Sequence, residues 1–272
     1  MVRRGMDPEG KIVLVTGAAG GIGGALVRAL CERGARCVVA ADLDGDGAAQ
    51  LGAELGEQRV PARTLDVTDE HATRTLVEEI ERDLGPIEVC FANAGLATGT
   101  GPEDPDTDWD RQWRVNVMSH VYAARALLPG WIERGDGHLV TTASMAGILT
   151  AVGDAAYSAT KHAALGFAEW IAITYGDRGV RASCVCPGAV DTAMLRAGAD
   201  GDAAKASAVI GGGEVLGPEQ AAERILDALA EDAFLILTHP EMREFAVGKA
   251  QDPERWIRGM VKLRARAQAL LS

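Results

Sequence analysis

The chain has 272 residues and a formal net charge of −12 at pH 7, because 39 Asp and Glu outnumber 27 Lys and Arg. A hydrophobic fraction of 47% excludes a disordered chain, and the length suits one α/β domain spanning residues 1–272. The acidic balance disfavours nucleic acid and anionic membrane surfaces, since both attract patches of Lys and Arg. No apolar run reaches the roughly 18 residues that cross a bilayer, and residues 1–8 lack the apolar stretch of a signal peptide. We therefore expect a cytoplasmic protein.

Short β-branched segments alternate with segments of helical period along most of the chain. The predicted strands are residues 11–16, 36–41, 60–65, 87–92, 138–142, 180–186 and 233–237, and the predicted helices are residues 22–33, 70–84, 109–133, 156–175 and 217–230. Strands that alternate with helices form a parallel sheet, because each crossover helix packs on one of its faces. The pattern predicts an α/β fold, a doubly wound parallel sheet of about seven strands with helices on both faces, in three α/β/α layers.

Residues 193–213 depart from this alternation. They are mostly Ala, Gly and Asp and end in three consecutive glycines, so they have little to bury. A long insertion between late elements of an α/β fold is more often a binding loop than structural filler. We predict a mobile substrate-binding loop here.

Residues 240–272 form a C-terminal extension of different composition. Residues 249–272 contain six Lys and Arg but only two acidic residues, Asp252 and Glu254. Apolar residues recur at helical spacing at Trp256, Met260, Leu263, Ala267 and Leu270. The pattern predicts an amphipathic helix, which packs on its own subunit or serves as an interface or pocket cover.

The five cysteines predict buried, reduced thiols. They form an odd set without C-x-x-C spacing, and each lies in or beside an apolar segment. Cys184 and Cys186 share one face of a predicted strand, but two ligands do not make a zinc site. We therefore expect no bound metal.

A glycine-rich turn follows the first predicted strand. Thr16 is followed by Gly17, Gly21 and Gly23, after which a helix begins. Glycine allows a tight turn and close approach of the backbone, and a helix N-terminus offers unpaired N–H groups and a positive dipole end. The order strand, turn and helix favours a pyrophosphate site over an ordinary flexible turn.

Tyr157 and Lys161 lie four residues apart on a predicted helix, so their side chains project from one face. A fixed positive charge stabilises phenolate and lowers the pKa of a tyrosine, which otherwise titrates near pH ~10. Alone, such a pair is most often a solvated helix pair. Two further polar residues accompany the pair: Ser144, which follows a predicted strand thirteen residues before Tyr157, and Asn116, which lies inside a predicted helix where Asn is mildly destabilising.

Together these motifs resemble the short-chain dehydrogenase/reductase family. The Thr-Gly-x-x-x-Gly-x-Gly pattern begins at Thr16, the Tyr-x-x-x-Lys pattern begins at Tyr157, and further matches extend the similarity over residues 11–192. Ala92 stands where the family's Asn-Asn-Ala-Gly segment has its first Asn. The resemblance implies a Rossmann-type fold, a nicotinamide cofactor and hydride transfer between a secondary alcohol and a ketone.

The resemblance also implies which residues contact the cofactor. These are Gly17, Ala19, Gly21, Ile22, Gly23, Asp42, Leu43, Asp66, Val67, Asn93, Ala94, Gly95, Tyr157, Lys161, Pro187, Gly188, Val190 and Thr192. Asp42 follows the glycines by about twenty residues, where a carboxylate accepts hydrogen bonds from the adenosine ribose and repels a 2′-phosphate. Gly20 and Leu43 occupy positions where NADP-dependent relatives usually have Lys or Arg. We therefore expect NAD to be preferred over NADP, unless Asp42 is merely a polar strand end.

The catalytic residues implied by the resemblance are Asn116, Ser144, Tyr157 and Lys161. Tyr157 exchanges a proton with the substrate oxygen, Ser144 holds that oxygen, Lys161 lowers the phenol pKa and grips the nicotinamide ribose, and Asn116 supports a water. Substrate contacts are expected from Ser144, Met145, Tyr157 and Met194. Leu195 and residues 149–154 add small or apolar walls, which suggest a hydrophobic or alicyclic secondary alcohol.

Several alternatives remain open at this stage. An NADPH-dependent carbonyl or 3-oxoacyl reductase and a non-catalytic NAD-sensing protein share the same fold. A sugar-nucleotide epimerase or dehydratase shares the Tyr-x-x-x-Lys pair, but its usual glycine spacing and larger C-terminal domain are absent here. We expect a small-molecule alcohol or ketone as the partner, without nucleic acid or membrane, and a homotetramer or homodimer.

Overall fold

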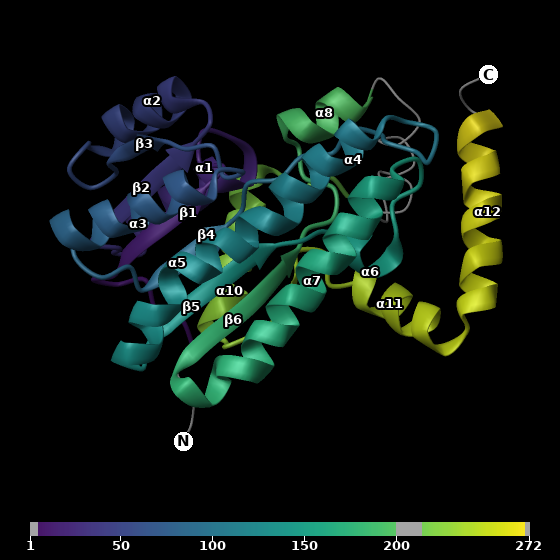
Figure 1. Cartoon of the computed structure of the whole chain (residues 1–272). Coiled ribbons are helices and arrows are strands. Elements are labelled where there is room, and N and C mark those ends of the chain that lie inside the picture. Colours follow the sequence, from purple (N-terminus) through teal and green to yellow (C-terminus); the bar gives the residue numbers. More distant parts are fainter. Residues whose placement is uncertain (1–4, 200–213, 270–272) are drawn as a thin grey trace.

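Seven parallel strands form one sheet in the order β3-β2-β1-β4-β5-β6-β7 (Figure 1). The computed structural model describes residues 5–199 and 214–269. The strands are β1 (Ile12–Thr16), β2 (Cys37–Asp42), β3 (Ala62–Thr64), β4 (Val89–Ala92), β5 (Gly137–Thr142), β6 (Val180–Cys186) and β7 (Leu235–Leu237). This arrangement confirms the predicted doubly wound Rossmann-type sheet.

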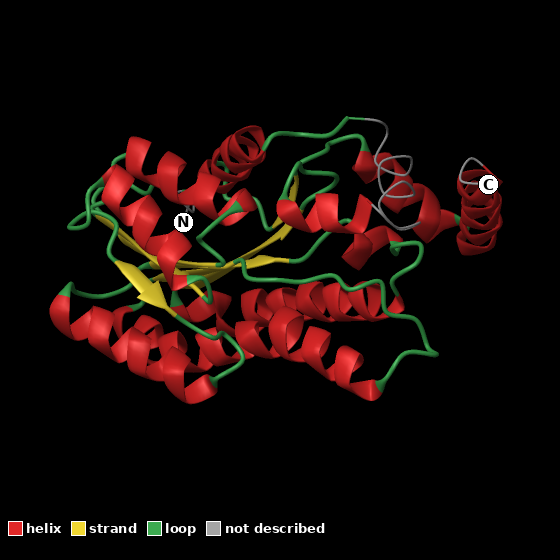
Figure 2. Ribbon diagram, turned by 90° about the horizontal axis from the view of Figure 1, so that it is seen from above, coloured by secondary structure: helices red, strands yellow, loops and turns green. Residues whose placement is uncertain are grey.

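Helices cover both faces of the sheet, giving three layers (Figure 2). One layer contains α1 (Gly21–Glu32), α2 (Gly45–Leu55) and α10 (Pro218–Ala230), and the other contains α3 (Glu70–Asp83), α5 (Ser119–Arg134) and α7 (Ala155–Tyr175). Successive residues of a strand face opposite sides, so Val13 and Val15 pack towards the first layer and Ile12 and Leu14 towards the second. Continuously apolar strands such as β1 are therefore buried on both faces.

The helix predicted at residues 109–133 is divided in the structure. It consists of α4 (Asp106–Trp113), a π-helical turn η1 (Arg114–Met118) and α5, with no break between them. The π-helical turn inserts one extra residue per turn, and such turns often occur at functional sites. Asn116 lies within it.

Helix α2 is absent from the predicted elements. Three glycines within its eleven residues lower its helix propensity, although Asp44 caps it by accepting a hydrogen bond from the Gly47 N–H at 3.0 Å. A Cβ at Gly52 would lie 2.6 Å from the Val60 carbonyl oxygen. Close packing of α2 on the chain leading to β3 therefore requires glycine at this position. The same glycine lowers the helix propensity by which the helix could have been predicted.

The two late segments contain further helices. Residues 193–199 of the predicted mobile loop form α8 (Ala193–Ala199), and residues 200–213 lie outside the described part of the chain. The C-terminal extension forms α11 (Met242–Gln251) and α12 (Pro253–Ala269). Helix α12 contacts α11 and stands apart from the three layers (Figures 1 and 2). The described residues also include two short helices, α6 (Ala146–Leu149) and η2 (Gly176–Arg178).

Candidate active site

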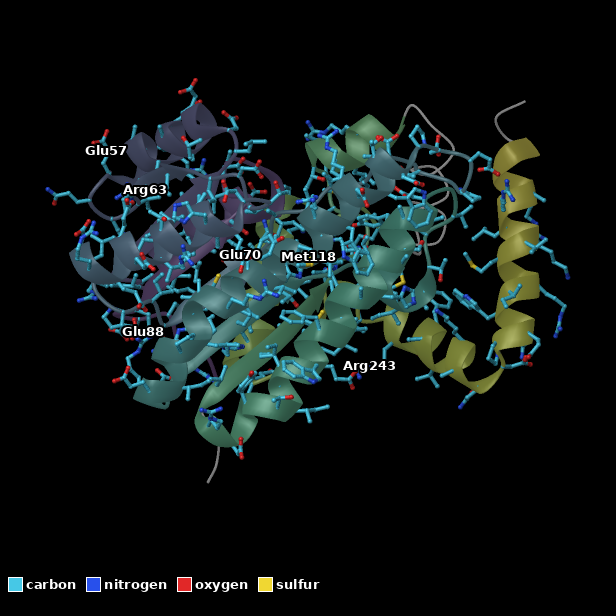
Figure 3. All side chains as sticks on the ribbon, viewed as in Figure 1. Glu57, Arg63, Glu70, Glu88, Met118 and Arg243 are labelled. Carbon is cyan, nitrogen blue, oxygen red and sulfur yellow. The ribbon has the colours of Figure 1, made fainter. Side chains whose placement is uncertain are left out.

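A cavity of about 1270 Å³ opens beyond the carboxyl ends of the strands, near the point where the strand order reverses between β1 and β4. Open parallel sheets bind ligands there because the connections after the two strands diverge. Glu88 precedes β4 and lies at the opposite end of the sheet (Figure 3). Nineteen predicted site residues line the cavity: Gly17, Gly21, Ile22, Asp42, Leu43, Asp66, Val67, Asn93, Ala94, Gly95, Ser144, Met145, Tyr157, Lys161, Pro187, Gly188, Val190, Thr192 and Met194.

The glycine-rich turn forms a backbone cradle at one end of the cavity. Gly17 and Gly21 adopt left-handed φ angles of 67° and 56°, which glycine tolerates without strain. Gly23 does not line the cavity, but a Cβ there would lie 1.9 Å from the Gly17 carbonyl oxygen. No side chain caps the start of α1, so its first N–H groups are available to an anion.

Two carboxylates beyond β2 and β3 are fixed by local hydrogen bonds. Asp42 accepts one from the Ala19 N–H and one from the Asp44 N–H, both at 2.9 Å. Ala19 does not line the cavity, and its N–H instead joins the glycine-rich turn to the end of β2. Asp66 accepts hydrogen bonds from the N–H and hydroxyl of Thr68 at 2.9 and 2.7 Å. Both acidic groups are therefore held in place on the same cavity wall.

Asn93 and Thr16 join three central strands beneath the cavity. The Asn93 amide donates to the Thr16 carbonyl at 3.1 Å and accepts from the Thr142 hydroxyl at 3.2 Å. The Thr16 hydroxyl accepts from the N–H groups of Asn93 and Ala94 at 3.0 and 3.1 Å. Ala92, the departure from the family pattern, is buried in β4. The sequence motif includes Thr16 but does not predict its hydrogen bonds to Asn93 and Ala94, because these join residues about 77 positions apart in the chain.

Helix α7 and the segment after β5 bring Tyr157, Lys161 and Ser144 together. Lys161 donates a hydrogen bond to the Thr142 carbonyl at 2.9 Å, and its Nζ lies 5.5 Å from the centre of the Tyr157 ring. Ser144 accepts from the Ala146 N–H at 3.1 Å, which leaves its own proton free to donate to the Tyr157 hydroxyl. The three side chains therefore form one polar group on the cavity wall.

Burial dominates the protonation of this group. It raises the pKa of Tyr157, the hydrogen bond with Ser144 lowers it in part, and Asp154 and Cys186 raise it further. Burial lowers the pKa of Lys161 to about 8. The raised pKa of Tyr157 is opposite to the expected direction, because burial opposes the charge on both members of the pair.

Asn116 lies behind the cavity wall and does not line it. Its fully buried amide accepts from the Leu96 N–H and donates to the Leu96 carbonyl, both at 2.9 Å, and donates to the Thr160 hydroxyl at 3.1 Å. A Cβ at Gly95 would lie 3.0 Å from Lys161 Nζ and 3.3 Å from Asn116 Oδ1. Asn116 therefore holds the chain after β4 against α7 beside the lysine.

The segment after β6 is supported by residues that follow β7. The Gly188 N–H donates to the Thr238 hydroxyl at 3.1 Å, and that hydroxyl lies 2.8 Å from His239 Nδ1. A Cβ at Gly188 would lie 2.5 Å from the same ring nitrogen. Thr238 and His239 are fully buried. They were not predicted as site residues, because they belong to no sequence motif.

The substrate side of the cavity includes predicted and unpredicted walls. Leu195 and residues 149–154 line it, as expected. Further lining comes from residues 96–99 and from Met242 of the C-terminal extension. Three residues of α4 and the first residue of η1, which share one helical face, also contribute: Thr107, Asp110, Arg111 and Arg114. Their helical spacing predicts that these side chains share one face. The sequence does not predict that this face lies against the cavity.

The described residues also exclude two other kinds of feature. No group of three His, Cys, Asp or Glu side chains in residues 5–199 and 214–269 could hold a metal ion. Within the same residues, no helix is long and apolar enough to span a membrane. All five cysteines are buried and free of disulfide bonds.

Comparisons with known proteins agree with the fold and with the resemblance found in the sequence. Residues 11–202 match the family described as short chain dehydrogenase. The chain is 37% identical over 244 residues to 1-deoxy-11-beta-hydroxypentalenate dehydrogenase of Streptomyces exfoliatus, covering 88% of this chain and 86% of that one. It is 33% identical over 245 residues to epidermal retinol dehydrogenase 2 of Mus musculus, covering 88% and 76%.

A solved structure provides the same agreement in three dimensions. The short chain dehydrogenase/reductase from Burkholderia phymatum in complex with NAD superposes with a TM-score of 0.82 at 27% identity, covering 92% of this chain and 96% of that one. The chain therefore belongs to the short-chain dehydrogenase/reductase family. It is an NAD(P)-dependent oxidoreductase that acts on CH–OH groups.

Proposed function

We propose that this protein interconverts a hydrophobic secondary alcohol and its ketone with NAD, using Tyr157 as the general acid and base. The observation that carries the proposal is the placement of Tyr157, Ser144 and Lys161 in the same cavity as the glycine-rich cradle. The nicotinamide ring, when bound, accepts or supplies the hydride. The side chains of this protein then bind and orient the substrate and transfer one proton.

The proton steps follow from the positions of the three side chains. In the oxidation direction, the Tyr157 oxygen takes the proton of the alcohol, while Ser144 donates a hydrogen bond that holds the substrate oxygen. In the reduction direction, Tyr157 returns the proton to the ketone oxygen. The raised pKa of Tyr157 favours the protonated phenol, so the residue starts as a proton donor unless another positive charge lies close to it.

The residues of the cavity fit a dinucleotide. The cradle leaves no room for side chains at Gly17 and Gly23, which favours close approach of a pyrophosphate to the backbone. Asp42 presents a fixed carboxylate where an adenosine ribose would lie, and Leu43 beside it is 70% exposed and carries no charge for a 2′-phosphate. These features support the preference for NAD over NADP.

The substrate side supports an apolar alcohol. Met145, Leu149, Val152, Met194 and Met242 line the cavity near Tyr157 or on its substrate side. The similar proteins are named for a hydroxypentalenate and for retinol. We infer a substrate whose hydroxyl is carried on a hydrophobic or alicyclic skeleton.

The test is a screen of secondary alcohols and ketones with NAD and NADP in parallel, following the absorbance of the reduced nicotinamide. The expected result is turnover of hydrophobic alcohols with NAD as the better cofactor. A preference for NADP would overturn the role given to Asp42, and absence of turnover together with NADH binding would favour a non-catalytic NAD-sensing protein.

We also infer a homodimer or homotetramer located in the cytoplasm. The five unpaired thiols support a reducing compartment. None of the described side chains of α12 is buried, and Ile257 and Val261 are 60% and 63% exposed. An apolar helix face of this kind is stabilised when a second copy of the chain covers it.

A further inference from the structure

Asp154 is a buried carboxylate directly before the helix that carries Tyr157 and Lys161. It is 4% exposed, and no Lys, Arg or His forms an ion pair with it among the described residues. A buried charge without a cation is costly unless hydrogen bonds replace its water. Its hydrogen-bond partners therefore show which parts of the structure the carboxylate connects.

One carboxylate oxygen caps the catalytic helix. Asp154 Oδ1 accepts from the backbone N–H of Tyr157 at 2.8 Å and from the Gln112 amide at 3.3 Å. Asp154 is the N-cap of α7, where a negative charge also interacts favourably with the helix dipole. The cap therefore acts at the residue that transfers the proton.

The other oxygen fastens a loop that lines the cavity. Asp154 Oδ2 accepts from the N–H groups of Thr98 and Gly99 at 3.1 and 2.8 Å. The first turn of α7 strengthens the connection, because the Ala155 N–H donates to the Thr100 carbonyl at 2.9 Å. Gln112, fully buried on α4, donates to the Thr98 hydroxyl at 2.7 Å as well as to Asp154. The loop is thus attached to the catalytic helix and to α4.

We propose that Asp154 is a positioning residue that couples the cavity wall at residues 98–99 to the catalytic Tyr157 through one shared carboxylate. The proposal rests on the proposed function, because it gives Tyr157 the proton transfer. Asp154 and residues 98–99 line the same cavity as Tyr157, so a ligand that orders this wall also bears on the start of α7. The carboxylate has a second effect through its charge, which opposes ionisation of the phenol.

Three groups on surrounding elements affect the pKa of the Tyr157 phenol, and a fourth, Lys161, lies 5.5 Å from the centre of its ring. Asp154 precedes α7, Lys161 lies one turn along it, Ser144 follows β5 and Cys186 ends β6. Asp154 is the carboxylate among these four groups. Replacing it removes a negative charge near the phenol and keeps Lys161, Ser144 and Cys186. Its removal is therefore expected to lower the pKa of Tyr157 from its raised position.

The test uses Asp154→Ser, because serine retains a cap for the Tyr157 N–H but is too short to reach residues 98 and 99 as well. Asp154→Asn is the second variant, since it removes the charge and replaces one acceptor oxygen with a donor. Asp69→Ser is the matched control, because Asp69 caps α3 through the Ala72 N–H at 3.0 Å and neither lines the cavity nor bonds to α7 or to residues 98–99. Thermal unfolding of each variant establishes that it is folded.

Two readouts need no substrate. The chain has three tyrosines, so the tyrosinate absorbance of each protein minus that of its Tyr157→Phe counterpart reports the titration of Tyr157. Both Asp154 variants should titrate at lower pH than the native protein, and amide exchange in residues 98–99 should be about tenfold faster or more, since two hydrogen bonds to a charged acceptor are lost. The Asp69→Ser control should change neither quantity.

An unchanged Tyr157 titration and unchanged exchange at residues 98–99 in a folded Asp154→Ser protein would overturn the inference. Asp154 would then be only a helix cap. The proposed function fails by a different result, namely a Tyr157→Phe protein that retains turnover. The two failures are therefore distinguishable.

Discussion

At the scale of single residues, the polar groups of the cavity are held by backbone partners far away in the sequence. Thr16, Asn93 and Thr142 join three strands, and Thr238 holds the turn at Gly188. Such contacts hold these polar groups in fixed positions, and proton transfer depends on the position of the reacting groups. The chemistry of the site therefore depends on the sheet as much as on the motifs.

The carboxylate of Asp42 is expected to decide between NAD and NADP. Asp42→Ala removes an acceptor for the ribose hydroxyls and the charge that repels a 2′-phosphate. Because a hydrogen bond to a charged group contributes about 1.5–3 kcal/mol, we expect NADH to bind about 10–100-fold more weakly. NADPH binding should weaken less or improve.

Fluorescence titration of NADH and NADPH measures both affinities without a substrate. Asp46→Ala, an exposed acidic residue in the first turn of α2, is the control and should leave both affinities unchanged. Equal losses for the two cofactors in Asp42→Ala would contradict the assignment.

The residues predicted from the sequence are those whose role depends on local spacing. The glycine-rich turn and the Tyr157–Lys161 pair combine chemistry and period within one or two elements. Thr238 and Met242 act through contacts between segments far apart in the chain, and no local pattern marks them. Asp154 lies in the segment predicted to line the pocket, but its hydrogen bonds to residues 98 and 99 have no local sequence signal. Local sequence patterns therefore predicted which motif residues line one cavity, and they missed many of the contacts that hold those residues in place.

At the scale of elements, apolar runs and helical periods were sufficient for the sheet and for most helices. Helix α2 was missed because its glycines are needed for close packing, as at Gly52. The π-helical turn at η1 could not be predicted, because its extra residue depends on how Asn116 bonds to Leu96 and Thr160. Local helix propensity thus failed to predict the backbone conformation where tertiary contacts determine it.

Strand β5 carries a buried histidine that should make the fold sensitive to acid. Burial lowers the pKa of His138 to about 3, and its Nε2 lies 3.0 Å from the Ser183 hydroxyl. The unfolded chain has an ordinary histidine pKa near ~6.5, so between these values the unfolded state binds more protons. Stability is therefore complete above about pH 6.5 and falls as the pH drops towards the folded value, by about 1.4 kcal/mol per pH unit.

His138→Gln retains a polar group for Ser183 and removes the titration. Urea unfolding at several pH values below neutrality should show a free energy of unfolding that depends less steeply on pH than in the native protein. His71→Gln, on the exposed face of α3, serves as the control and should keep the native slope. A His138→Gln protein with the native slope would show that another group causes the acid sensitivity.

At the scale of the whole molecule, charge is distributed unevenly. The chain is acidic overall, yet α12 contains five basic residues and one acidic residue. Residues 101–110, by contrast, contain five acidic residues and no basic one. Helix α12 is the outermost element, with side chains projecting into open surroundings on its outer side (Figure 3). These opposite charges favour contact between the α12 helix of one copy and an acidic surface of another.

Deletion of residues 253–272 is expected to reduce the size of the assembly. The apolar face of α12 would no longer be available to a second copy, and light scattering after size exclusion should report a smaller particle. The double variant Ile257→Ser with Val261→Ser should act in the same direction, whereas Lys262→Gln should have a smaller effect. A native protein that is monomeric at all concentrations would contradict this account.

Tyr157 is proposed to transfer the proton in an NAD-linked oxidation. The most direct measurement compares Tyr157→Phe with the native protein, using the best alcohol from the screen and NAD, together with an NADH titration of both proteins. Loss of a general acid and base should lower kcat by about 10²–10⁴-fold while the NADH dissociation constant stays the same. Near-native kcat in Tyr157→Phe would contradict the account.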